Sequence, residues 1–229
     1  MNIAVIPARG GSKRIPKKNI KLFNNKPIIY WSIKTAQDSK IFDKIIVTTD
    51  DKKIAKIANK FGAETPFLRK KTLAKNHIST VEVVRDAIIQ LKKDNLKIDN
   101  VCCIYPAAPL ISSKDIVKGY KKLRKSIDYV LCASTFPSSI HRAFDINKKI
   151  KKLKIIFPNK FDRCMDRNKK LYFDAGQFCW GSKSSWIKRK NVFKSRVDVV
   201  EIPRWRSQDI NFIEDWITTQ KLFKLKTIV

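Results

Sequence analysis

Histidine and cysteine are scarce in this chain, and neither is spaced as a metal site requires. The 229 residues include two histidines, His77 and His141, and no C-x-x-C pair. A structural zinc site needs four such ligands at short spacing, so the sequence predicts no metal cluster of this kind. The five cysteines show no paired framework and are expected to be reduced, those in apolar runs being buried. They are Cys102, Cys103, Cys132, Cys164 and Cys179.

Long hydrophobic runs are also missing. No apolar segment approaches the roughly 20 residues that a membrane-spanning helix needs. A β-branched run, Ile3 to Ile6, begins almost at once, so we expect neither a signal peptide nor a transit peptide. The sequence therefore predicts a cytoplasmic protein with no membrane partner.

Acidic residues are few beside basic ones. The chain has 20 Asp and Glu against 50 Lys and Arg, a net charge of +30, which brings nucleic-acid binding into consideration. The basic residues are spread along the whole chain, however, and aromatic residues do not alternate with them on one strand. We expect no specific nucleic-acid partner and keep nucleic-acid binding as the alternative from another class.

Strand and helix patterns alternate along most of the chain. Short apolar runs end near residues 6, 49, 105 and 134, and helix-type spacing lies between them, as in Ile54, Ile57, Ala58 and Phe61. Ser79 and Glu82 form a capping box before one such helix. The alternation predicts an α/β fold, with a mostly parallel, doubly wound (Rossmann-like) sheet covered on both faces. We expect one domain over residues 1–229.

The alternation breaks between residues 136 and 172, where prolines and basic clusters interrupt short strand-like pieces. This segment is expected to leave the sheet as an excursion. Strand-like Asp174 to Gly181 and Val197 to Ile202 then return to it, and a helix from Phe212 to Phe223 closes the chain.

A basic, glycine-containing loop follows the first expected strand; we call residues 8–19, ARGGSKRIPKKN, the phosphate loop. Gly10 and Gly11 allow close backbone approach, so that amide N–H groups can face phosphate oxygens. Five cations in the loop can neutralise several negative charges. Neither G-x-G-x-x-G nor G-x-x-x-x-G-K-[ST] is present. The loop therefore points to a nucleoside triphosphate. The five cations are Arg9, Lys13, Arg14, Lys17 and Lys18.

The phosphate loop resembles the signature A-R-[GQ]-[GN]-S-K-x-x-P-x-K-N of the cytidylyltransferases that activate nine-carbon acidic sugars, and it fits at every constrained position. A second segment, Gln208 to Trp216, resembles that family's Q-D-I-D-T-x-E-D-W, with Asn211 at the second aspartate. We call residues 208–216 the carboxylate segment. Two further stretches, Cys102 to Pro109 and Asp174 to Gly181, are similar to the C-C-I-Y-x-x-A-P and D-A-G-Q-F-Y-W-G of the branch that acts on pseudaminic acid.

The resemblance implies a nucleotidyltransferase that converts CTP and a nine-carbon acidic sugar, with pseudaminic acid first, to a CMP-sugar and pyrophosphate. It also implies Mg²⁺ as cofactor and a homodimer, in which the excursion helps to form the interface. Legionaminic acid, N-acetylneuraminic acid and the eight-carbon Kdo are alternative sugars. An inactive homologue is a further alternative, because Asn211 is a poorer ligand for a hard cation than aspartate.

The resemblance also assigns residues to roles. The catalytic residues implied are Lys18, Arg9 and Asp209. Those implied for the nucleotide are Ala8, Arg9, Gly10, Gly11, Ser12, Lys13, Lys18, Asn19, Arg69 and Thr80. Those implied for the sugar are Tyr105, Arg142, Gln177 and Phe178, and those for the metal are Asp209 and Asn211.

Several roles stay open at this point. Asn211 either helps to bind the metal or, with Glu214, caps the last helix. Asp50 either serves the carboxyl edge of the sheet or caps the helix after it. Gly176 and Gln177 either serve the site or form a strand bulge. His141 is a general base or a packing residue, and the sugar carboxylate has three candidate partners, Arg142, Arg163 and Arg167.

Overall fold

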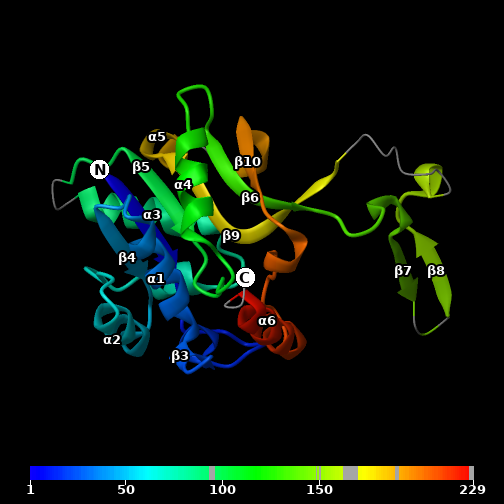
Figure 1. The fold of residues 1–229 in the computed structure, drawn as a ribbon, viewed down its shortest axis with the longest axis horizontal. Coiled ribbons are helices and arrows are strands. Elements are labelled where there is room, and N and C mark those ends of the chain that lie inside the picture. Colours follow the sequence, from blue (N-terminus) through cyan, green and yellow to red (C-terminus); the bar gives the residue numbers. More distant parts are fainter. Residues whose placement is uncertain (93–95, 148, 150, 162–169, 189–190, 227–229) are drawn as a thin grey trace.

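The protein is built on one six-stranded sheet (Figure 1), seen in a computed structural model that describes residues 1–92, 96–147, 149, 151–161, 170–188 and 191–226. The strands lie in the order β10 (Val197–Glu201), β6 (Tyr129–Thr135), β9 (Tyr172–Ser182), β5 (Asn100–Ile104), β1 (Asn2–Pro7) and β4 (Lys44–Thr48). β1 pairs in parallel with β4 and β5, and β10 pairs in parallel with β6. β9 runs antiparallel to both of its neighbours. The predicted α/β fold with a mostly parallel sheet is confirmed.

Helices cover both faces of this sheet, as predicted. They are α1 (Ile28–Ser39), α2 (Lys52–Lys60), α3 (Thr80–Lys92), α4 (Ser113–Lys122), α5 (Lys183–Lys188) and α6 (Ile213–Lys226). One apolar cluster joins the sheet to Ile33 of α1, Ile54 of α2 and Ile116 of α4. The cluster on the other face contains Ile88 of α3 and Trp186 of α5. Both faces of the strands are therefore buried, which explains their continuous apolar sequences.

The last helix packs on a third cluster, beside the phosphate loop. Trp216 and Phe223 of α6 contact Phe23 at ring-centroid distances of 5.4 and 5.5 Å. Phe23 belongs to a short hairpin of β2 (Leu22–Phe23) and β3 (Lys26–Pro27), and Ile15 of the phosphate loop joins the same cluster. This packing brings the phosphate loop and the carboxylate segment together.

Helix ends follow the signals in the sequence. The Glu82 carboxylate accepts hydrogen bonds from the Ser79 N–H at 2.8 Å and from its hydroxyl at 2.7 Å, which is the predicted capping box. Asp51, and not Asp50, caps α2 by accepting the Lys53 N–H at 2.7 Å. Gly62, with φ of +84°, follows the end of α2 in the left-handed conformation that favours glycine.

The segment between β6 and β9 leaves the sheet. β7 (Phe144–Asn147) and β8 (Lys152–Ile155) form an antiparallel hairpin that stands apart from the body (Figure 1). Its apolar side chains Phe144, Ile146 and Leu153 are exposed. Arg163, Cys164 and Arg167 lie outside the described residues.

The four described cysteines are buried free thiols: Cys102, Cys103, Cys132 and Cys179. Burial holds the pKa of the Cys103 thiol far above its ordinary value, so this group stays protonated and unreactive. Within the described residues, no three His, Cys, Asp or Glu side chains are grouped to hold a metal ion. Nor does any described helix have the length and apolar content to cross a membrane.

Candidate active site

A cavity of about 660 Å³ opens at the carboxyl edge of β1 and β5. Parallel strands present ligand sites at this edge, because loops of different strands converge there. Ten of the residues that the sequence selects line it. They are Arg9, Ser12, Lys13, Lys18, Asn19, Arg69, Thr80, Tyr105, Asp209 and Asn211. The structure thus brings together the phosphate loop, the start of α3 and the carboxylate segment.

The phosphate loop is shaped by its own polar groups. The Asn19 side chain is buried and donates to the Arg9 carbonyl oxygen at 2.9 Å, which closes the loop on itself. Lys17 has a left-handed backbone, with φ of 53°, and turns the chain so that Lys18 faces the cavity. Asn19 therefore holds the loop's shape, and the cations around it are the groups available to phosphates.

Ala8 and Gly10, which are predicted to bind the nucleotide, both donate their backbone N–H groups to other parts of the protein. The Gly10 N–H is donated to an Asp50 carboxylate oxygen at 2.9 Å, and an added Cβ would come within 2.9 Å of Asp51. Ala8 is fully buried and its N–H is donated to the Thr48 carbonyl. The Gly10 amide ties the loop to Asp50, just after β4, whereas Gly11 is exposed and an added Cβ there would meet no atom within 4 Å. Contact of Ala8, Gly10 and Gly11 with the nucleotide stays a prediction.

Asp50, whose role the sequence leaves open, and Asn76, which it does not single out, both organise the site. Asp50 holds Gly10 and also lies 3.8 Å from the Arg69 guanidinium. Asn76 accepts a hydrogen bond from Arg9 at 2.7 Å and so holds that cation at the cavity wall. No local pattern marks either contact, because each partner is at least 19 residues away along the chain.

Lys18 joins the phosphate loop, to which it belongs, to the carboxylate segment. Its ammonium donates to the Ile210 carbonyl oxygen at 2.7 Å. Burial lowers the pKa of Lys18; Asp209 opposes this shift, while the cations Arg14 and Arg9 add to it. Lys18 is thus a partly desolvated cation, held at the point where both motifs meet.

Arg69 is a buried cation without a full set of partners. It is 5% exposed, and its Nε and Nη2 atoms make no hydrogen bond within the described structure. Burial lowers the pKa of its guanidinium, with Asp50 opposing the shift. Leaving such donors unsatisfied is costly. The site therefore offers planar donors to a carbonyl or similar acceptor of a ligand.

Tyr105 and Thr80 form the wall nearest to α3. The Tyr105 hydroxyl is hydrogen-bonded to Thr80, and burial raises the pKa of this phenol well above its usual range. A second cavity of about 300 Å³ shares these two residues and reaches Asp174. Burial raises the pKa of the Asp174 carboxyl, with a further contribution from Asp209. The sequence did not single out Asp174, although it begins the motif that carries Gly176.

Three of the four expected sugar contacts do not reach the cavity. Phe178 is 0% exposed and packs against Gly119, and Gln177 is buried with its amide donated to the Arg206 carbonyl. Arg142 lies in the excursion, where His141 packs against Phe157. We correct Gln177 and Phe178 to core residues; in the described chain only Tyr105 of this group lines the cavity.

Gly176 lies in a strand bulge and also lines the cavity. The register of β9 on β6 shifts between Leu131 and Ala133, and Gly176, with φ of +59°, lies in the shifted part. Gly176 faces the carboxylate segment: a Cβ added to it would lie 3.7 Å from the Asp209 carboxyl carbon. The bulge thus makes room for Asp209 at the cavity.

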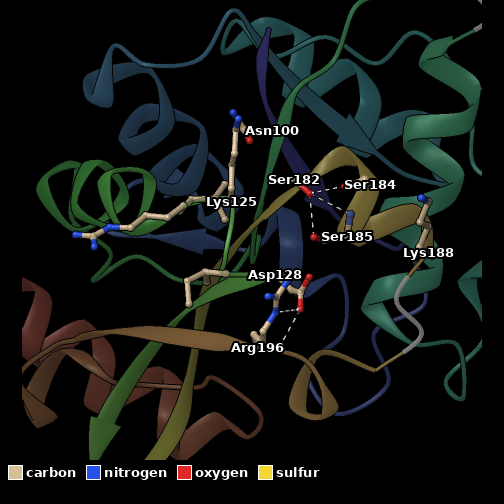
Figure 2. Close-up of a pocket in the computed structure, with 11 residues that line it drawn as sticks. Asn100, Lys125, Asp128, Ser182, Ser184, Ser185, Lys188 and Arg196 are labelled. Atoms are coloured by element: carbon tan, nitrogen blue, oxygen red, sulfur yellow. Dashed lines mark hydrogen bonds and ion pairs between the residues drawn. The ribbon is translucent and has the colours of Figure 1, made fainter.

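A slightly larger cavity, of about 710 Å³, lies at the opposite edge of the sheet (Figure 2). Its lining comes from the starts of β5 and β6 and from the end of the antiparallel β9. Polar groups there bond to one another: Asp128 pairs with Arg196, and Ser182 bonds to Ser184 and Ser185 (Figure 2). None of the motifs reaches it, so the carboxyl-edge cavity is the candidate active site.

The fold and this site define a nucleotidyltransferase, in which a basic loop after the first strand faces a carboxylate across a nucleotide-sized cavity. The chain belongs to the cytidylyltransferase family, whose sequence pattern matches residues 3–225.

Relatives and solved structures agree with this class. The chain is 38% identical over 226 residues to the pseudaminic acid cytidylyltransferase of Campylobacter jejuni subsp. jejuni serotype O:2, covering 98% of this chain and 97% of that one. It is 30% identical to the CMP-N,N'-diacetyllegionaminic acid synthase of Legionella pneumophila subsp. pneumophila, covering 97% and 96%. Its fold is similar to that of CMP:2-keto-3-deoxy-manno-octonic acid synthetase complexed with CTP, with a TM-score of 0.73 at 13% identity over 98% and 99% of the two chains.

Proposed function

We propose that this enzyme joins CTP to pseudaminic acid, giving the CMP-sugar and pyrophosphate, in the cytoplasm where CTP is available. The observation that carries the proposal is the single cavity on which four of the five phosphate-loop cations, Arg69 and Asp209 converge. Relatives named for pseudaminic acid at 38% and 36% identity, over 98% of the chain, support the choice of sugar.

In the proposed reaction the anomeric hydroxyl of the sugar attacks the α-phosphorus of CTP. A new P–O bond forms as the bond to the bridging α,β-oxygen breaks, the hydroxyl proton is released, and pyrophosphate leaves. The protein positions these groups and balances their charge. In this proposal Lys18, which is half-buried and donates to the Ile210 carbonyl oxygen, stabilises charge that develops on the phosphates. Arg9 and Lys13 line the same cavity.

Mg²⁺ fits these residues as an ion held jointly by the protein and the triphosphate. Magnesium is commonly held by one or two carboxylates together with substrate phosphates and waters. Asp209 is exposed at the cavity and faces the phosphate loop, so it supplies one carboxylate for such an ion. When bound, the ion would neutralise charge on the triphosphate.

The test is pyrophosphate release with each of four nucleotides and a panel of acids: pseudaminic, legionaminic, N-acetylneuraminic and Kdo. We expect turnover with CTP and pseudaminic acid that exceeds every other pair by at least tenfold in kcat/KM. Turnover with another acid alone would retain the reaction and exclude the sugar proposed. Folded protein that releases pyrophosphate with no pair, and whose nucleic-acid binding falls steeply with salt, would favour the nucleic-acid alternative.

We also propose a homodimer in which the β7–β8 hairpin contacts the partner. The hairpin stands apart from the body, and its apolar side chains have no cover in the single chain (Figure 1). A hairpin of two strands has little stability alone in water, so a partner surface would explain its composition.

Ile146→Lys is expected to shift the protein from dimer toward monomer, because it places a charge in the proposed interface. Light scattering coupled to size exclusion measures the mass directly. Ile89→Lys on α3 is the matched control, since Ile89 is 48% exposed and Ile146 is 50% exposed. A wild-type monomer at micromolar concentration, or equal effects of the two variants, would reject the hairpin interface.

A further inference from the structure

Asn211 is hydrogen-bonded at both ends of its side chain. Its amide oxygen accepts from an Arg14 guanidinium nitrogen at 2.6 Å, and its amide nitrogen donates to the Asp209 carboxylate at 2.7 Å. The side chain thus links the phosphate loop to the carboxylate that faces the cavity.

The chemistry of the two partners fixes the orientation of this amide. A guanidinium can only donate hydrogen bonds, and an ionised carboxylate can only accept them. An asparagine between them satisfies both in one orientation, with its oxygen toward Arg14 and its nitrogen toward Asp209. An aspartate at position 211 would still accept from Arg14 but would set an oxygen against the Asp209 oxygen.

The surroundings hold Asn211 in this place. Its backbone N–H is donated to the Asp215 carboxylate at 2.8 Å, and the same carboxylate accepts from Phe212 at 2.7 Å. Asp215 therefore caps α6, and the alternative in which Asn211 and Glu214 cap this helix is wrong. The Phe212 ring lies 5.1 Å from the Arg14 guanidinium carbon, which restrains the other end of the link.

We propose that Asn211 is a positioning residue for Asp209 and not a metal ligand. Its amide oxygen is directed toward Arg14, and the group that it presents beside the Asp209 carboxylate is a donor nitrogen, which does not bind a cation. Among the described residues that line the cavity, Asp209 is the one carboxylate, so the cation would enter together with the triphosphate. This last step rests on the proposed use of CTP; the side-chain orientation does not.

Binding of Mn²⁺ followed by electron paramagnetic resonance, without sugar and hence without turnover, tests the proposal. Wild-type protein without CTP should bind Mn²⁺ at least tenfold more weakly than Asn211→Asp, which places a second carboxylate beside Asp209. Gln208→Glu is the matched control: it makes the same amide-to-acid change in the carboxylate segment, where Gln208 donates to the Trp205 carbonyl instead. It should leave Mn²⁺ binding unchanged.

A second variant separates positioning from general structure. Asn211→Ala should weaken Mn²⁺ binding in the presence of CTP by about 10-fold to 100-fold, as loss of a partner of a metal-binding carboxylate does elsewhere. The unfolding temperature and the affinity for metal-free CTP should stay close to wild type. Equal changes in all three quantities would assign Asn211 a structural role only.

Two results would overturn the proposal. Wild-type protein that binds Mn²⁺ without CTP as tightly as Asn211→Asp would make the Asn211 oxygen a ligand. Asn211→Asp that binds no more tightly than wild type would show that position 211 does not face the ion. Failure of the wild type to bind CTP, by calorimetry with Mg²⁺, would instead reject the proposed function and leave the comparison of nucleotide-free proteins valid.

Discussion

Lys18→Met is expected to lower kcat by about 10²-fold to 10³-fold, with a smaller change in KM for CTP, because it removes one preorganised donor from developing charge. Methionine fills similar space, and the position is half-buried, so the variant should fold. Pyrophosphate release under saturating sugar measures both constants. Lys17→Met is the matched control: Lys17 belongs to the same loop but is exposed and is not part of the cavity lining, so it should retain activity within about threefold.

The pH dependence of the same residue gives an independent check. Burial lowers the pKa of Lys18, so the ammonium loses its proton at a lower pH than an exposed lysine does. The charged form is the active one, and kcat should therefore be full below this pKa and fall as pH rises through it. Lys18→Arg should move the alkaline fall to higher pH, since a guanidinium stays charged. An unchanged alkaline limb in Lys18→Arg, or wild-type kcat in Lys18→Met, would remove Lys18 from the chemistry.

The sequence predicts the mostly parallel sheet but not the direction of one of its strands, β9. Apolar runs and helix spacing reveal burial on both faces, which is a local property, so the mostly parallel sheet was predictable. The antiparallel direction of β9 was not predictable, because an apolar pattern reports that a strand is buried and not which way it runs. Direction depends on how the chain returns from the excursion, and the residues at 136–172 carry no pattern that specifies it.

In the site, too, local features were predictable and contacts between distant residues were not. Cations in the phosphate loop were predictable because their spacing is local and their charge suits phosphate. The contacts of Gly10 with Asp50 and Asp51 were not predictable, because they are made across some 40 residues of the chain. Phe178 and Gln177 were misread for another reason. A bulge at Gly176 shifts the alternation of β9, and a motif alone does not tell which of its side chains point inward.

Asn211 shows where a departure from a family pattern is informative. From sequence it was either a weakened ligand or a helix cap. In the structure Asp215 caps the helix, and Asn211 bonds to Arg14 and Asp209 instead. The pairing of Arg14 with residues 211 and 212 links positions nearly 200 apart, which explains why no local pattern revealed it.

Asp209→Asn is expected to lower kcat/KM by about 10³-fold at low Mg²⁺, because it removes the carboxylate that faces the phosphate loop. Asparagine keeps the size of the side chain, and Asp209 is exposed, so stability should change by less than about 1 kcal/mol. The variant should also loosen the link to Asn211, whose amide nitrogen would lose its charged acceptor. Initial rates across a series of Mg²⁺ concentrations measure the effect.

The dependence on Mg²⁺ separates a metal-binding role from a direct one. If Asp209 binds the ion, raising Mg²⁺ should recover part of the lost rate, because the triphosphate still attracts the ion. If Asp209 acts instead as a base for the sugar hydroxyl, the loss should be the same at every Mg²⁺ concentration and should vary with pH. Glu214→Gln is the matched control, since Glu214 is an exposed carboxylate of the same segment outside the cavity lining, and it should stay near wild type. Equal losses in both variants would mean that total charge, and not the position of Asp209, supports the reaction.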